Sequence, residues 1–153
     1  MKNLTIVSEG TNYSAINLGD FDNLMDYSFL HPKLKSEVKG KVFIGEFIKS
    51  TGTEISFQIL PPQTSVPFLH QHKNHEEIYI IVKGSGQFQV DNCIFDIKEG
   101  SIIRIAPDGQ RTWRNNSDNP MVFMCIQSQQ NSLDNYSVLD GFRTHGEILW
   151  DKK

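Results

Sequence analysis

The chain has 153 residues and a mass of 17.5 kDa, a length that one domain commonly has. Apolar residues make up 38% and charged residues 22%, which is typical of a globular protein and excludes general disorder. With 15 basic and 18 acidic side chains and a net charge of −3, the composition gives no electrostatic basis for binding nucleic acid or an anionic membrane.

The first residues lack the apolar run of a secretion signal, and no stretch approaches the ~18–20 apolar residues that span a bilayer. The two cysteines, Cys93 and Cys125, lie in apolar, strand-like runs and are predicted to be buried free thiols. We therefore expect a cytoplasmic protein in a reducing compartment.

The first 40 residues contain one helical signal. Apolar residues at Phe21, Leu24, Met25 and Phe29 recur at helical spacing, and the helix is expected to end before Pro32. A short helix within an irregular N-terminal segment is therefore predicted. The chain has only two alanines, while Ile, Val, Phe and Thr recur throughout, which favours strands elsewhere.

From Lys41 the pattern changes to short apolar runs separated by turn residues. The turn at Asp91-Asn92 has the length of a two-residue hairpin loop. Eight or nine short strands at this spacing predict an all-β sandwich or barrel. The expected strands span residues 42–48, 53–60, 66–72, 77–82, 87–90, 93–97, 102–105, 112–114 and 122–127.

The C-terminal part of the chain is different in character. Residues 127–135 are rich in Gln, Asn and Ser and are predicted to form a surface excursion. Residues 138–153 carry Phe142 and Trp150, and this tail is expected to pack either on its own domain or on a neighbouring molecule.

The residues that carry chemistry lie between 70 and 84. His70 and His72 are two apart, so on a strand both imidazoles project from the same face. Glu77 begins the next strand after a short turn, and pairing of the strands would bring its carboxylate beside them. Two imidazoles and one carboxylate are a common ligand set for Zn, Mn, Fe or Ni.

With Gly84 added, this spacing resembles the first motif of the cupin superfamily. That motif has two histidines separated by one residue, then a glutamate, and then a glycine. The resemblance covers roughly residues 40–127 and implies a double-stranded β-helix, or jelly-roll, barrel. It also implies that His70, His72 and Glu77 hold a divalent metal inside the barrel, although a degenerate cupin that binds no metal stays an alternative.

The second cupin motif is incomplete, because its ligand histidine is missing from residues 100–116. Aligning the motif on Gly100 and Asn115 places Arg111 at the histidine position and Trp113 where cupins often carry an aromatic residue. Aligning it on Pro107 and Gly109 instead places Thr112 at the histidine position.

We favour Arg111 over Thr112 at this position. Arginine cannot bind a metal, because its guanidinium is always protonated and has no free lone pair. If Arg111 faces the barrel, it needs a compensating anion such as Glu77 or a bound carboxylate or phosphate. The alternative is an outward, solvated Arg111.

Strand alternation adds further candidates for the pocket wall. Phe68 shares the parity of His70, and Tyr79 shares that of Glu77. Tyr79 and Arg111 are the catalytic candidates, and both are expected to contact substrate together with Phe68 and Trp113. Core packing is the alternative role for Tyr79, and solvation in the turn is the expected role of His75.

The expected organisation is an N-terminal extension at residues 1–40 that packs on the barrel, a barrel core at 41–127 and a C-terminal extension at 128–153. The resemblance implies a metal-dependent enzyme for a small polar or anionic molecule, either a dioxygenase or a sugar or sugar-phosphate isomerase. The alternatives are a non-catalytic sensor or storage module and a structural scaffold. A homodimer is expected, because cupins commonly pair and exposed sheet edges need cover.

Overall fold

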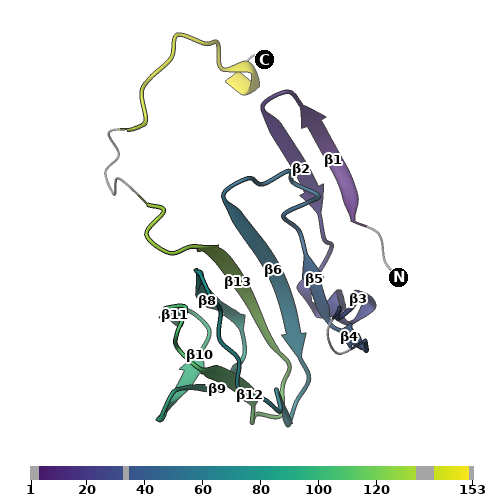
Figure 1. Ribbon diagram of the computed structural model, residues 1–153. Helices are drawn as coiled ribbons and strands as arrows, with labels where there is room; N and C mark the ends of the chain where they lie inside the picture. The colour runs from purple at the N-terminus through teal and green to yellow at the C-terminus, as the bar shows by residue number, and fades with distance from the viewer. Residues whose placement is uncertain (1–3, 33–34, 134–139, 152–153) are drawn as a thin grey trace.

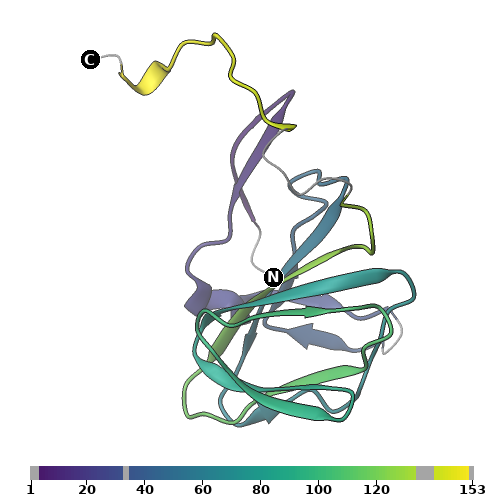
Figure 2. The same cartoon turned by 90° about the vertical axis from the view of Figure 1, so that its left-hand side faces the viewer.

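Two antiparallel sheets form a jelly-roll barrel in the computed structural model, which describes residues 4–32, 35–133 and 140–151 (Figures 1 and 2). The larger sheet has the strand order β11 (Ile102–Ile105), β8 (His75–Lys83), β13 (Met121–Gln129), β6 (Thr53–Leu60) and β5 (Lys41–Phe43). The smaller sheet has the order β10 (Cys93–Lys98), β9 (Ser85–Val90), β12 (Arg111–Asn115) and β7 (Thr64–Ser65). The predicted all-β jelly-roll class is confirmed.

Alternating side chains give the larger sheet two buried faces. In β6, Leu60 and its same-face neighbours point into the barrel, whereas Ile59 and its neighbours point to the outside. The barrel interior is filled by four aromatic side chains whose neighbouring ring centroids lie 5.0–5.8 Å apart. These are Tyr79, Phe88, Trp113 and Phe123.

The outer face of the larger sheet is covered by the N-terminal segment. This segment contains the 3-10 helix η1 (Phe21–Asp26) and a pair of short strands, β3 (Ser28–Leu30) and β4 (Glu37–Lys39). Leu24, on η1, is fully buried against Ile59 and Val122 of the sheet. The predicted short helix therefore exists, but it is a 3-10 helix of six residues.

A hairpin of β1 (Thr5–Gly10) and β2 (Tyr13–Asn17) extends away from the barrel, as does the segment that ends in the 3-10 helix η3 (Leu149–Asp151) (Figures 1 and 2). The hairpin was not predicted, because its residues do not alternate between apolar and polar. Within the described residues, no helix is long and apolar enough to cross a membrane.

Two predicted strands are shorter than expected. The strand expected at 42–48 ends at Phe43, because the chain turns where the Gly45 N–H donates to the Glu54 side chain at 2.8 Å. The strand expected at 66–72 is replaced by single contacts to β12, because Pro67 has no N–H for a ladder. His70 still pairs with Arg111 through an isolated bridge.

The expectation for the cysteines is half right. Both are free thiols, and Cys125 is buried inside the barrel on β13. Cys93 is exposed, because it begins the edge strand β10 directly after the turn at residues 91–92.

Gly84 joins β8 to β9 at φ +83, in the left-handed region, and a Cβ there would lie 2.5 Å from the Pro120 carbonyl oxygen. Gly84→Ala should therefore lower the free energy of unfolding by about 2–4 kcal/mol, measured by urea denaturation. Gly100→Ala is a matched control, because Gly100 has φ +85 but open space around it, and it should cost about 1 kcal/mol. Equal losses in the two variants would show that the contact with Pro120 is unimportant.

Candidate metal centre

Glu77 lies at the centre of the candidate site. Alternation along β8 points Glu77 and Tyr79 into the barrel, and the Glu77 side chain is buried. Arg111, the first residue of β12, is fully buried opposite Glu77 and forms an ion pair with Oε2 through Nη2, with Nε at 3.1 Å from the same oxygen. The pair therefore joins the two sheets.

Arg111 faces the barrel, and Thr112 does not. The Arg111 Nη1 also donates to the Gly109 carbonyl at 3.1 Å, so the guanidinium is held on several sides. The Thr112 hydroxyl donates to the Val66 carbonyl at 2.8 Å on the neighbouring segment. Of the two alternatives in the sequence, Arg111 is the one whose side chain meets Glu77.

Glu77 is ionised in this environment. Burial alone would raise its pKa, but hydrogen bonds from Arg111 and Tyr79 outweigh this and lower the pKa below its ordinary value. The Tyr79 hydroxyl donates to Oε2 at 2.7 Å, and burial holds the pKa of Tyr79 well above its usual value. Tyr79 therefore keeps its proton and helps to fix the carboxylate.

The other carboxylate oxygen faces a histidine. Glu77 Oε1 lies 3.1 Å from Nε2 of His72, and the side-chain amide nitrogen of Gln127 on β13 lies 3.1 Å from Nδ1 and 3.4 Å from Nε2 of the same ring. Gln127 was not proposed from the sequence, because only the pairing of β13 with β8, which sets Gln127 opposite Glu77, places it here.

His70 completes the cluster. Its ring centroid lies 5.8 Å from that of His72 and 5.7 Å from that of Trp113. Within the described residues its Nδ1 is buried and has no hydrogen-bond partner. Burial, aided by repulsion from Arg111, lowers the pKa of His70 to about 4, and burial is also the main cause that lowers the pKa of His72. Both rings are neutral at pH 7, the form that binds metals.

These three side chains fit a metal ion. One ligand atom from each of His70, His72 and Glu77 lies within 4.8 Å of the others. Two bonds of ~2.1 Å at right angles would separate two ligand atoms by ~3 Å, close to the 3.1 Å between His72 Nε2 and Glu77 Oε1. Since Arg111 and Tyr79 both bind Oε2, Oε1 remains the natural ligand oxygen.

The remaining predicted residues surround this cluster at different depths. Phe68 is 47% exposed, with its ring centroid 6.2 Å from that of His70, so it lies at the rim. Trp113 is buried behind His70 as part of the aromatic core. His75 begins β8 with an exposed side chain and does not join the cluster.

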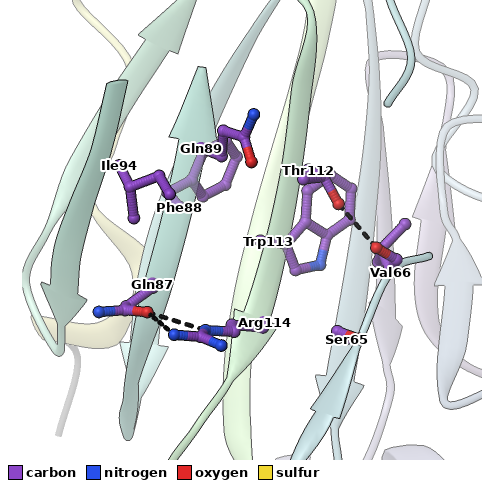
Figure 3. A pocket seen from close by; sticks show the side chains of 9 residues that line it. All are labelled: Ser65, Val66, Gln87, Phe88, Gln89, Ile94, Thr112, Trp113 and Arg114. Atoms are coloured by element: carbon purple, nitrogen blue, oxygen red, sulfur yellow. Dashed lines mark hydrogen bonds between the residues drawn. The ribbon is translucent and has the colours of Figure 1, made fainter. Parts of the chain in front are cut away.

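A separate hollow of about 210 Å³ lies where β9 and β12 pair (Figure 3). It is spanned by a hydrogen bond of 2.8 Å from Arg114 Nε to Gln87 Oε1. None of the three candidate metal ligands lines it, so it is not the candidate site. Its lining residues are Ser65, Val66, Gln87, Phe88, Gln89, Ile94, Thr112, Trp113 and Arg114.

Comparison with known proteins agrees with this architecture. Residues 56–127 match the family model described as "Cupin domain". A cupin protein of Bacteroides fragilis is 39% identical, with a TM-score of 0.65, over 68% of this chain and 88% of that chain.

Two further relatives are more distant. A Thermotoga maritima protein described as a "predicted oxalate decarboxylase" is 25% identical, with a TM-score of 0.54, over 62% of this chain and 83% of its own. An uncharacterised Methanocaldococcus jannaschii protein is 30% identical over 54% of this chain, and the match spans 66% of that protein, just under two thirds of its length. With its jelly-roll barrel and the cupin match at residues 56–127, the chain belongs to the cupin superfamily.

Proposed function

We propose that this cupin binds a divalent metal through His70, His72 and Glu77 and uses it to bind and transform a small anionic molecule. The observation that carries the proposal is that the two oxygens of Glu77 have different partners. Arg111 and Tyr79 donate hydrogen bonds to Oε2, whereas Oε1 faces His72. A carboxylate fixed through one oxygen is arranged to bind a metal through the other.

A metal bound by three protein ligands keeps open positions, where it can polarise a substrate oxygen or bind dioxygen. The protein side chains around it supply orientation and charge. Arg111 neutralises Glu77, so the centre would keep the full charge of its metal and attract an anion. The Thermotoga maritima neighbour, whose description names the dianion oxalate, supports the same class of ligand.

Among the reaction types, the geometry favours an oxygenase over an isomerase. An isomerase moves a proton at carbon and needs a side chain that is free to accept it. Tyr79 and Arg111 are both engaged with Glu77, and the Cys125 thiol, whose pKa burial raises to about 12, stays protonated. An oxygenase depends mainly on open metal positions, which the three-ligand set provides.

A ligand-binding cupin without turnover is the second candidate. The engagement of Tyr79 and Arg111 with Glu77 favours it too, because neither group is free for proton transfer. Mass spectrometry of a bound ligand after long incubation separates the two. Chemical change of the ligand would exclude this candidate.

Untagged protein purified without chelator should carry about one equivalent of Fe, Mn, Ni or Zn by elemental analysis. A His70→Ala/His72→Ala variant should lose it, because two of three ligands are removed. His145→Ala is the matched control, because His145 is exposed and far from the cluster in sequence, and it should keep the metal. Wild-type protein that stays free of metal after incubation with each ion would contradict the proposal.

Arg111→Met should lower the free energy of unfolding by about 3–5 kcal/mol, because the buried Glu77 carboxylate loses its counter-ion. The double variant Arg111→Met/Glu77→Leu should be more stable than the single variant, since neither charge is then left alone. Arg114→Met, on the same strand but exposed, should change stability by less than about 1 kcal/mol. Chemical denaturation of the three variants tests this, and a double variant less stable than Arg111→Met would contradict it.

A further inference from the structure

Lys41, on the edge strand β5, presents its side chain to the barrel interior. It pairs with Gln58 of β6, and Gln58 shares the inward face of β6 with Ser56 and Leu60. Its neighbour Val42 faces the opposite way and packs in the outer core. Lys41 was not among the candidate residues in the sequence, because only the strand register assigns it to this face.

The ammonium group of Lys41 is directed toward the metal centre. Its Nζ lies 4.8 Å from the centroid of the Phe43 ring, so the side chain runs along β5 from Lys41 toward Phe43. Phe43 pairs with Ser56 of β6, and Ser56 pairs in turn with Cys125 of β13. Cys125 pairs with Tyr79 of β8, so these residues form one row across the sheet. Glu77 is the next inward-facing residue of β8 after Tyr79.

This ammonium has no carboxylate partner. Within the described residues no ion pair involves Lys41, and Glu77 is already neutralised by Arg111. Removal from water lowers the pKa of Lys41, with attraction from Glu77 acting in the opposite direction. Lys41 is half-buried and Phe43, whose ring its ammonium contacts, is 38% exposed, so this part of the rim borders solvent.

We propose that Lys41 is an anion-binding subsite at the β5 rim, which holds the far carboxylate or phosphate of a ligand whose near oxygen reaches the metal centre. The inference rests on the proposed function for the near group only. The ligand class that fits is a small molecule with two anionic groups. One group would meet the proposed metal and the other the Lys41 ammonium on the same inner face.

Isothermal titration calorimetry with malonate, a dicarboxylate probe, tests this subsite. Lys41→Met should weaken malonate binding at least tenfold, Lys41→Arg should keep most of it, and both should retain the wild-type metal content. Lys39→Met is the matched control, because Lys39 is exposed on β4, and it should bind as the wild type does.

Titrating inorganic phosphate into metal-free protein separates this proposal from the proposed function. Phosphate binding that is lost in Lys41→Met supports the subsite even if no metal is ever found. Wild-type protein that binds neither probe, or Lys41→Met protein that binds both as tightly as wild type, would overturn it.

Discussion

The buried ion pair between Glu77 and Arg111 is the constraint on which the rest of the site depends. Each partner belongs to a different sheet, so the pair fixes how the sheets meet at this end of the barrel. Burying two charges costs several kcal/mol per ion, and only a close, multiply hydrogen-bonded geometry offsets that cost. Arg111 meets this condition through the planar fork of its guanidinium, which a lysine cannot reproduce.

The same pair determines the charge of the centre. In cupins the position of Arg111 is expected to carry a fourth neutral ligand, which would add a donor but no charge. A guanidinium removes that donor and cancels the carboxylate, so a divalent metal here would keep its full positive charge. Lys41 adds a second positive group on the same inner face, although the chain as a whole is acidic.

The sequence predicted the parts of the site that depend on local spacing. His70, His72 and Glu77 were identified because a period of two fixes which side chains share a face, although His70 and His72 lie outside a regular strand. The choice between Arg111 and Thr112 stayed open, because a shift of one residue in the loop before β12 would turn every side chain of that strand to the opposite face of the sheet. Only the pairing of the whole strand decides it.

The parts that the sequence did not predict depend on long-range pairing. Gln127 and Lys41 reach the inner face because β13 and β5 pair with β8 and β6 in one register, and no local pattern encodes that register. The hairpin at residues 5–17 has no alternation to detect, because β1 is exposed at every residue and the three inner residues of β2 are all half-buried. Burial produces the periodic signal, and elements that the domain itself does not bury lack it.

The packing of the barrel also determines where a ligand can lie. Tyr79, Phe88, Trp113 and Phe123 fill the middle of the interior, with ring centroids too close to leave space between them. The inward-facing charged pair of Glu77 and Arg111 therefore lies at one end of the barrel, and Lys41 lies at the rim formed by β5. A ligand of these groups would have to be small and to enter beside exposed rings such as Phe43 and Phe68. The aromatic core thus favours small, highly charged molecules over bulky apolar ones.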